Sequence, residues 1–526
     1  MKIVTVEQML ELERRSAEAG FPPEMLMENA GLAAAKSAKD FLGDILGRSI
    51  LVFAGPGNNG GDGLVAARYL HDWGAKVHLF LFKRKTRNDK NFALDTERGI
   101  GWTDIRSDED LLRLDAALPS ADMVIDALFG TGKTRPIEGV IKQALERVKA
   151  KKERRPDLKI LAIDLPSGLN ADTGAIDPAC LSADLTVTLG YPKIGLLQFP
   201  GAARLGRLQI ADIGILADLA ADIKTQLIAA DTVRSLLPAR PPDANKGTFG
   251  RLLVVAGSIN YVGAAYLACE GAMRTGTGLV TLAIPRSLQP ILAGKLTEAT
   301  YVPLPEDEPG IIGIEAVPVI RERLAGYDAV LLGCGLGQNA ATVEFVKKLL
   351  PSLSLPMVID ADGLNILAQI PHWPQNLKAN AVLTPHPGEM SRLTGIPIPE
   401  IQKDRLGVTR RAAATWGQTV VLKGAHTVIA SPDGRARISG FANPGLSSAG
   451  TGDVLAGAIA GMLAQGLQPF DAATVGVYLH AMAGELVKAE MGDTGMIASD
   501  LLPKLPLAIK NCKDEGGRMN RKRGRC

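Results

Sequence analysis

A run of small residues that ends in an aspartate carries the strongest chemical signal in this chain. Residues 443–453 read Asn-Pro-Gly-Leu-Ser-Ser-Ala-Gly-Thr-Gly-Asp, and the apolar stretch 454–464 behind them predicts a buried helix. Small residues at a helix start leave backbone N–H groups free for a phosphoryl oxygen. Asp453, just inside that helix, can accept the proton of an attacking hydroxyl. The pattern favours phosphoryl transfer to an alcohol, although a plain helix cap would also explain it.

A glycine-rich segment in the first half offers a second place for an anion. Residues 55–63 read Gly-Pro-Gly-Asn-Asn-Gly-Gly-Asp-Gly and lie between a strand-like run and a helix-like run. Such a turn lets backbone amides approach a phosphate at the positive end of the helix. Gly55, Gly57 and Gly60 match the GxGxxG pattern of dinucleotide-binding proteins. The next strand-like run ends in the basic residues 83–85, where an ordinary NAD site has an acid, so a standard NAD site is not indicated.

Oxygen-bearing side chains follow three strand-like runs of the first half. Asn59 lies in the glycine-rich turn, Asp126 ends a later run, and Asp164 and Ser167 follow a third. Because the carboxyl ends of parallel strands meet at one edge of a sheet, we expect these side chains to converge. Asn59, Asp126 and Ser167 supply only hard oxygen ligands, which suit Mg²⁺, Ca²⁺ or an alkali cation. Each of them singly is also explained by a turn or a cap. Asp164, at the end of a buried strand, is suited to proton transfer.

Two polar residues of the second half are candidates with equally good structural explanations. Lys423 follows a strand-like run and could reach a nucleotide phosphate, but an ordinary surface lysine would look the same. His386 lies between two prolines that fix its backbone, which suits either a site residue or a structural turn.

The elements that would position these residues alternate between strand and helix. Thr5 and Gln8 have the spacing of a capping box and Gly20 ends that helix, so two helices are expected before the first strand. Strand-like runs follow at 49–55, 76–82, 123–130, 159–166 and 184–190, and in the second half at 251–258, 278–285, 328–335, 356–363, 381–388 and 419–430. The alternation predicts an α/β fold with parallel sheets covered on both faces.

A proline-rich stretch separates the two halves. Residues 236–247 hold three prolines within five positions, which neither a helix nor a strand can continue. We expect two domains, at residues 1–230 and 231–510. The basic segment 511–526 is expected to be a frayed, disordered tail. The halves share no repeat period, so a duplication is not indicated.

Composition excludes several classes of protein. The 59 basic and 56 acidic residues give a net charge of +3, which argues against a nucleic-acid or membrane partner. The five cysteines include no CxxC pair, so neither a disulfide framework nor a zinc site is indicated and a cytoplasmic location is expected. The longest apolar run, 454–464, is shorter than the roughly 20 residues that cross a bilayer. A homo-oligomer is expected.

Four motifs of the first half occur together in one known enzyme domain. They are MENAG at 27–31, GPGNNGGDGLVAAR at 55–68, DALFGTG at 126–132 and IDLPSGLNADTG at 163–174, and they resemble the NAD(P)H-hydrate epimerase domain. The resemblance implies a Rossmann-like three-layer α/β/α domain in which Asn59, Asp126 and Ser167 bind K⁺. Asp164 would be the catalytic acid or base that contacts the substrate. The implied pocket comprises Asn58, Asn59, Gly60, Gly61, Asp62, Gly130, Thr131, Gly132, Lys133, Thr134, Arg135 and Pro136. Lys133 departs from the family, which commonly has an aliphatic residue there.

The motifs of the second half resemble the ribokinase-like superfamily, in which the aspartate of a GxGD motif is the base for phosphoryl transfer. YVGAA, GCGLG, DADGLN, TPHPGEMSRLTG, KGAHT and NPGLSSAGTGD together resemble its ADP-dependent NAD(P)H-hydrate dehydratase domain. The resemblance implies that Asp453 is catalytic and that the hydrate is contacted by Ala264, Gly337, His386 and Asp453. The adenine nucleotide would be held by Lys423, Gly424, Ala425, His426, Thr427 and Gly452, with Mg²⁺ beside it.

Both resemblances imply one substrate, a nicotinamide coenzyme to which water has been added. The chain is expected to interconvert the (6R) and (6S) forms of hydrated NADH and NADPH in its first half. The second half would dehydrate the (6S) form with ADP, giving NAD(P)H, AMP and phosphate. Two alternatives are a ribokinase-like kinase of a small vitamin alcohol and a first half that is only a non-catalytic nucleotide- or protein-binding module. Product analysis separates the first, and epimer exchange after Asp164→Ala the second.

Overall fold

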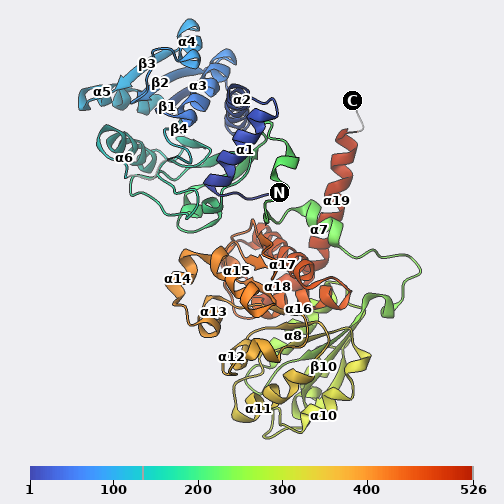
Figure 1. Ribbon diagram of the computed structural model, residues 1–526. Coiled ribbons are helices and arrows are strands. Elements are labelled where there is room, and N and C mark those ends of the chain that lie inside the picture. The colour runs from blue at the N-terminus through green and yellow to red at the C-terminus, as the bar shows by residue number, and fades with distance from the viewer. Residues whose placement is uncertain (133–135, 524–526) are drawn as a thin grey trace. The chain divides into compact units, whose positions relative to one another are not determined.

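The computed structural model describes residues 1–132 and 136–523, which form two compact units (Figure 1). The first unit is Met1–Ile223 and the second is Lys224–Cys526. The division falls slightly before the predicted boundary at residue 230. The reason is that the short strand β8 (Thr225–Leu227) pairs with β17 (Ala436–Ile438), and so belongs to the sheet of the second unit.

The first unit is built on a parallel sheet of seven strands in the order β3-β2-β1-β4-β5-β6-β7. The order reverses between β1 and β4, and a sheet of this kind binds ligands at the carboxyl ends of its strands beside such a reversal. Its strands are β1 (Ser49–Ala54), β2 (Lys76–Phe82), β3 (Gly101–Ile105), β4 (Met123–Ala127), β5 (Lys159–Ile163), β6 (Leu185–Leu189) and β7 (Arg207–Ala211).

Helices cover both faces of this sheet, because its strands bury side chains on both sides. Ile50 and Val52 of β1 belong to one core, with residues of α2 and α3, while Leu51 and Phe53 belong to the other, with residues of α5 and α6. The predicted pair of leading helices is present, and Thr5 caps the first of them through a capping box with Gln8. The helices are α1 (Val6–Glu18), α2 (Pro23–Leu42), α3 (Asn58–Asp72), α4 (Lys90–Glu97), α5 (Asp108–Ala117) and α6 (Gly139–Arg154).

The second unit contains a sheet of ten strands in the order β11-β10-β9-β12-β13-β14-β15-β16-β17-β8. The pairs from β11 to β15 are parallel, whereas β15–β16 and β16–β17 are antiparallel. The strand order reverses between β9 and β12. Besides β8 and β17, the strands are β9 (Arg251–Val255), β10 (Leu279–Pro285), β11 (Thr300–Leu304), β12 (Ala329–Leu332), β13 (Met357–Ile359), β14 (Ala381–Leu383), β15 (Thr419–Leu422) and β16 (Val428–Ala430).

This sheet is also covered on both faces, so the predicted α/β fold is confirmed in both units. Leu252 and Val254 of β9 pack with α8, α16 and α17, and Leu253 and Val255 pack with α10, α11 and α15. The helices are α7 (Ala230–Leu236), α8 (Val262–Arg274), α9 (Gln289–Ala293), α10 (Ala316–Arg321), α11 (Ala340–Leu349), α12 (Asp362–Leu367), α13 (Pro387–Thr394), α14 (Ile398–Lys403), α15 (Arg405–Trp416), α16 (Thr451–Ala464), α17 (Pro469–Met491), α18 (Ala498–Leu501) and α19 (Leu505–Arg523).

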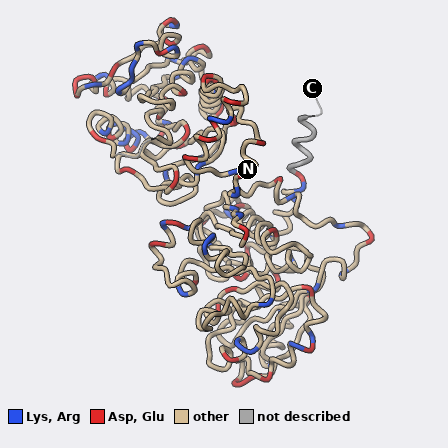
Figure 2. The backbone as a smooth tube through the Cα atoms, viewed as in Figure 1, with Lys and Arg blue, Asp and Glu red and all other residues tan. Residues whose placement is uncertain are grey.

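The last helix, α19, runs through most of the segment that the sequence predicts as a tail, and residues 524–526 lie outside the described residues. Figure 2 shows Lys and Arg interspersed with Asp and Glu along both units. Within the described ranges, no helix has the length and apolar composition needed to cross a membrane.

Candidate active sites

The glycine-rich turn after β1 brings the backbone very close to the loop after β4. A Cβ added at Gly55 would lie 1.8 Å from the carbonyl oxygen of Leu128, and one at Gly60 would lie 2.1 Å from that of Gly55. Only glycine fits at these two positions. Nη1 of Arg84 donates to the carbonyl oxygens of Gly55 (2.7 Å) and Gly57 (3.1 Å), which fixes the turn. The turn leads directly into α3, where no described side chain caps the first N–H groups, so they are available to an anion.

Asn59, Asp126 and Ser167 lie around the loop that follows β4. Both polar atoms of the Asn59 amide are buried, and neither has a hydrogen-bond partner among the described residues. A Cβ at Gly130 in this loop would lie 3.4 Å from the Asn59 Cβ. Ser167 donates to the Asp126 carboxylate from its N–H (2.8 Å) and its hydroxyl (2.6 Å), and Phe129 N–H donates to the Ser167 hydroxyl (3.0 Å). The unpaired Asn59 oxygen and the Asp126–Ser167 pair both border the loop after β4, and hard oxygen atoms of this kind fit a cation such as K⁺.

The Asp126 carboxyl is fully enclosed by protein. Burial raises its pKa, although the hydrogen bonds from Ser167 and from Leu128 N–H work in the opposite direction. A cation bound beside Asp126 would lower its pKa and favour the ionised carboxylate, as these hydrogen bonds do.

Asp164 follows β5 with a backbone φ of +68°, which is uncommon for a residue other than glycine. Its Oδ1 atom accepts hydrogen bonds from Lys193 Nζ, Thr188 Oγ1 (3.3 Å) and Leu189 N–H (3.2 Å). Its Oδ2 atom accepts none from the described residues and lies 3.6 Å from where a Cβ on Gly130 would be. One oxygen of Asp164 is therefore held by the protein, and the other is available beside the loop that also contacts Asn59.

Two further carboxyl groups share the electrostatic environment of Asp164. Burial, followed by the negative charges of Asp164 and Glu13, raises the pKa of Asp62 well above its usual range, against the opposing charges of Lys193 and Arg84. Burial also raises the pKa of Glu13, which Lys193 lowers and Asp164 raises further. The site thus collects three acids around one buried ammonium group.

The remaining residues implied for the first pocket fall on two segments. The first turns of α3 contain Asn58, Asn59, Gly60, Gly61 and Asp62. The loop after β4 contains Gly130, Thr131, Gly132 and Pro136. Lys133, Thr134 and Arg135 lie outside the described residues.

In the second unit, Asp453 lies in the first turn of α16, which begins after Gly450 in a left-handed conformation (φ +88°). Burial, and then the negative charge of Asp360, raise the pKa of Asp453 to about 7, while a hydrogen bond from Cys334 lowers it. A carboxylate with this pKa exchanges a proton near neutral pH, as a general base must.

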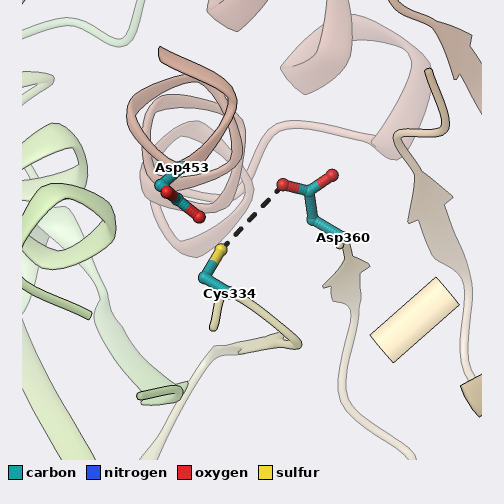
Figure 3. Close-up of side chains that lie close together, drawn as sticks. All are labelled: Cys334, Asp360 and Asp453. Carbon is teal, nitrogen blue, oxygen red and sulfur yellow. Dashed lines mark hydrogen bonds between the residues drawn. The ribbon is translucent and has the colours of Figure 1, made fainter. Parts of the chain in front are cut away.

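Cys334, Asp360 and Asp453 form a compact cluster (Figure 3). Their ligand atoms lie within 4.8 Å of one another, and the Cys334 thiol donates to Asp360 Oδ2 over 4.0 Å. Burial first, and then the charges of Asp453 and Asp360, raise the pKa of Cys334 well above its ordinary value. A neutral thiol is a poor ligand for Mg²⁺, and Asp360 is already paired with Lys423. The cluster does not fit a resident Mg²⁺ ion.

Lys423 places a positive charge beside the start of α16. Its Nζ donates to Asp360 Oδ1 (2.6 Å), lies 3.6 Å from Glu389 Oε2, and would lie 3.6 Å from a Cβ on Gly452. Burial by itself would lower the pKa of Lys423, but the charges of Asp360 and Glu389 raise it above its usual value. The charged amine and the N–H groups of α16 are together suited to a phosphate group.

His386 is the N-cap of α13. It therefore has the structural turn role that the sequence allowed beside a role in the site. Its Nδ1 accepts hydrogen bonds from the N–H groups of Gly388 (2.9 Å) and Glu389 (3.3 Å). Burial, and then the charge of Lys423, lower the pKa of His386. The ring is half-exposed, and its other nitrogen, Nε2, lies 3.5 Å from Glu389 Oε1.

Ala264 and Gly337 lie on neighbouring segments. Ala264 is in the first turn of α8, and a Cβ at Gly335 in the loop after β12 would lie 2.7 Å from its Cβ. Gly337 N–H donates to Asp362 Oδ2 (2.9 Å). A Cβ at Gly450 would lie 2.6 Å from Leu267 of α8, so α8 contacts both this loop and the start of α16.

The segment from Lys423 to Thr427 connects β15 to β16. His426 has a φ of +51°, and its Nδ1 lies 3.0 Å from the Ser439 carbonyl oxygen. Thr427 Oγ1 donates to the Gly424 carbonyl oxygen (2.8 Å). These contacts hold the turn in one conformation, with Gly424 and Ala425 between them.

Sequence reasoning missed several residues that shape the two sites. Lys193 is hydrogen-bonded to Asp164 and Glu13 interacts with it electrostatically, but a single lysine after a strand and a single glutamate on an amphipathic helix have no distinguishing pattern. Asp360 stood within the DADGLN motif and was not singled out. His480 was missed as well: burial lowers its pKa to about 4, and its neutral ring donates from Nε2 to the Thr451 carbonyl oxygen (2.9 Å) at the start of α16.

The fold and the two sites define a two-domain α/β protein. Each unit places an aspartate, Asp164 or Asp453, at the carboxyl end of an open sheet beside a glycine-rich segment that opens a helix. The model of the family described as NAD(P)H-hydrate dehydratase matches residues 252–507. The model described as YjeF-related protein N-terminus matches residues 23–195.

Curated relatives match the chain over nearly its full length. The bifunctional NAD(P)H-hydrate repair enzyme Nnr of Moorella thermoacetica is 44% identical over 524 residues, which cover 98% of each chain. The enzyme of the same name from Thermofilum pendens is 38% identical and covers 98% of this chain and 97% of its own. The solved ADP/ATP-dependent NAD(P)H-hydrate dehydratase of Bacillus subtilis is 34% identical and covers 55% of this chain and 98% of its own, with a TM-score of 0.47. This chain belongs to the family of bifunctional NAD(P)H-hydrate repair enzymes.

Proposed function

We propose that the chain restores hydrated NADH and NADPH in two reactions, one in each unit. The first unit interconverts the (6R) and (6S) hydrates. The second unit dehydrates the (6S) hydrate with ADP as co-substrate, releasing NAD(P)H, AMP and phosphate. The family supports both activities, and the residues of the two sites supply the groups that each reaction needs.

The observation that carries the dehydration is the position of Asp453, partly buried at the start of α16 with a pKa of about 7. Hydroxide is a poor leaving group, so the 6-hydroxyl must first be converted into a better one. Asp453 accepts the proton of this hydroxyl while its oxygen attacks the terminal phosphorus of ADP, and the bond to the bridging oxygen breaks to release AMP. The ring nitrogen then expels phosphate from C6, and loss of a proton from C5 completes the dihydropyridine ring.

The residues around Asp453 stabilise charge rather than move protons. Lys423 and the first N–H groups of α16 would bind the phosphate that is transferred, a role supported by the 3.6 Å between Lys423 Nζ and the position of a Cβ on Gly452. His480 holds the carbonyl of Thr451 and so fixes the first turn of that helix. Mg²⁺, arriving with the nucleotide, would neutralise phosphate charge when bound, with the phosphates rather than the Cys334 cluster as its principal ligands.

In the first unit, Asp164 is the group that moves the proton of the 6-hydroxyl. Its free oxygen, Oδ2, lies beside the loop after β4, and the uncapped start of α3 is suited to the substrate pyrophosphate. Asp164 takes the proton of the hydroxyl as the C6–N1 bond opens to an aldehyde, and N1 keeps the bonding electron pair and takes up that proton. Closure on the other face, with the proton returned to the hydroxyl, gives the second epimer. K⁺, held by Asn59, Asp126 and Ser167, would supply positive charge for an oxygen of the substrate.

A mixture of the two NADH hydrate epimers, resolved by chiral chromatography, tests the proposal. With ADP, the full chain is expected to convert both epimers into NADH, seen as recovered absorbance at the wavelength of the reduced coenzyme. With ADP and Asp164→Asn, only the (6S) form is expected to disappear rapidly. A stable phosphorylated product would instead identify a kinase, and equal epimer exchange with and without Asp164 would remove the catalytic role of that residue.

A further inference from the structure

Lys193 is a buried lysine that no part of the proposed chemistry uses. It lies after β6, its side chain is 1% exposed, and its Nζ donates to Asp164 Oδ1, to the Leu189 carbonyl oxygen (2.9 Å) and to Thr188 Oγ1 (3.3 Å). These contacts use all three donors of the ammonium group. A buried charge is tolerated only when it is paired in this way, so Lys193 is committed to its present position.

The backbone around Lys193 is also fixed. Val4 forms an isolated parallel bridge with Lys193, in which Ile194 N–H donates to the Val4 carbonyl oxygen (3.1 Å) and Val4 N–H donates to that of Pro192 (3.0 Å). The N-terminal segment therefore holds the loop that carries the lysine. The ammonium group of Lys193 can orient Asp164. Its three N–H donors are already hydrogen-bonded to protein atoms, so none of them is left to bind a substrate.

The charges around Asp164 explain why an ammonium group is needed there. In the part of the chain that the structure describes, Glu13 on α1 and Asp62 on α3 are acids that interact electrostatically with this site, and Arg84 after β2 is a cation that acts on Asp62. Arg84 is occupied by Asp89 (2.7 Å) and by the carbonyl oxygens of the glycine-rich turn. Among the described residues, Lys193 is thus the cation that is hydrogen-bonded to Asp164.

We propose that Lys193 is the positioning residue of the first site: by binding Oδ1 of Asp164, it holds the carboxylate in one orientation and leaves Oδ2 as the oxygen that exchanges a proton with the substrate hydroxyl. This inference rests on the proposed epimerase function. The left-handed backbone of Asp164 and the three hydrogen bonds on Oδ1 then act together, because they leave the carboxylate one orientation.

The test measures exchange of the two epimers without ADP, in the full-length chain. Lys193→Met is expected to lower kcat about 100-fold with KM changed less than about twofold, because the group that reacts is misplaced and the binding surface is intact. Lys193→Arg should recover part of this loss, since it restores the charge and a donor. Lys152→Met is the matched control: Lys152 pairs with Asp184 (2.8 Å) in the same unit and should leave exchange within about twofold of wild type.

A double variant separates catalysis from folding. Lys193→Met alone leaves a buried carboxylate unpaired, whereas Lys193→Met with Asp164→Asn removes both charges and should fold normally. The double variant is expected to exchange epimers no more slowly than Asp164→Asn alone, because both changes disable the same group. ADP-dependent dehydration of the (6S) hydrate, measured on the same samples, should be unchanged in every variant.

Three results would overturn the inference. Lys193→Met could exchange the epimers at the wild-type rate, or it could change KM alone and leave kcat intact. The third is a double variant whose fold decrease in rate equals the product of the two single-variant decreases. Each of them leaves the epimerase function intact. Failure of the proposed function would look different, because Asp164→Asn and wild type would then exchange the epimers at the same rate.

Discussion

The two candidate sites each contain an aspartate that we propose acts on the 6-hydroxyl, but the charged group nearest to that aspartate differs between them. Asp164 in the first unit has the Lys193 ammonium on one oxygen. Asp453 in the second unit has the Asp360 carboxylate as its principal charged neighbour, and burial together with that charge raises its pKa to about 7. Lys423 lies nearby but is hydrogen-bonded to Asp360 rather than to Asp453.

The difference follows from what each site must bind. An epimerase moves a proton of a single substrate and binds no second, anionic substrate. A buried ammonium group fixed to its aspartate is compatible with that reaction. The dehydratase must admit the negative charge of ADP, and its base must release its own proton before taking one from the substrate. A carboxylate with a pKa near 7 can release its own proton and take one from the substrate at neutral pH with little free-energy cost. Lys423 is then available to bind the phosphates of ADP.

The largest effect is expected at Asp453. Asp453→Asn keeps the shape of the side chain but removes the base, so dehydration of the (6S) hydrate should fall about 10³-fold, while epimer exchange stays at the wild-type rate. The measurement is recovery of NADH absorbance with ADP. Asp500→Asn is the control, because Asp500 also lies at a helix start and accepts a hydrogen bond from Ile497 N–H (2.9 Å). Equal rates in Asp453→Asn and wild type would end the assignment of Asp453 as the base.

A smaller effect is expected at the proposed cation site of the first unit. Asn59→Leu removes two buried polar atoms that have no partner among the described residues, so the protein should stay at least as stable. Epimer exchange should fall about 10-fold to 100-fold and lose its dependence on K⁺. Exchange rates in KCl and in choline chloride at equal ionic strength measure this. A variant that still responds to K⁺ as wild type does would place the cation elsewhere.

The pH dependence of dehydration should follow the ionisation of Asp453. Asp453 acts as a base only when ionised, and its pKa is about 7, so kcat/KM for dehydration should rise as the pH increases through 7. The ionised fraction changes about tenfold between pH 6 and pH 8 for such a group. Initial rates on the (6S) hydrate with saturating ADP give the profile. A flat profile over this range would show that Asp453 is already ionised well below pH 7.

The smallest effect on activity is expected at Asp95, a buried acid outside both sites. Neither carboxylate oxygen of Asp95 has a partner in the described part of the chain, and burial raises its pKa to about 8. The folded protein therefore keeps a proton that the unfolded chain releases near pH 4, and its free energy of unfolding falls as pH rises from about 4 to about 8. Asp95→Asn has no titrating carboxyl at this position, so this decrease in the free energy of unfolding should be absent.

We expect Asp95→Asn to be more stable than wild type by about 1 to 3 kcal/mol at pH 8.5 and little changed at pH 4, with both activities retained. Urea unfolding at the two pH values measures the difference. The control is Asp110→Asn, because this exposed acid accepts hydrogen bonds at a helix start and has a lowered pKa. If Asp95→Asn showed the same stability difference at both pH values, burial of the charged carboxyl would not be its cause.

Strands buried on both faces were predictable, and edge strands were not. β1, β4 and β5 have apolar runs because both faces are covered, and the sequence predicts each of them. β3 and β7 are the outer strands of the first sheet and are partly exposed, so their sequences, GWTDI and RLQIA, have no such run. β11 contains a proline and β8 has three residues, which leaves too little pattern to identify them.

The sequence by itself determined the residues that can react and the turns that carry them. Asn59, Asp126, Asp164 and Asp453 could be singled out because chemically capable side chains follow buried strands or open helices, and because glycine-rich motifs surround them. These are local properties of the chain, and the parallel α/β alternation implies which edge of the sheet receives them.

Only the tertiary structure decided which charged groups lie around each candidate carboxylate. Lys193 lies 29 positions after Asp164 and Lys423 lies 63 positions after Asp360, yet both pairs are hydrogen-bonded. Nothing in the local pattern relates such residues, because their proximity is created by the crossing of strands and loops in space. Burial and Coulomb interactions depend on those distances, so the same residue type becomes a lysine-bound carboxylate in one unit and an acid with a near-neutral pKa in the other.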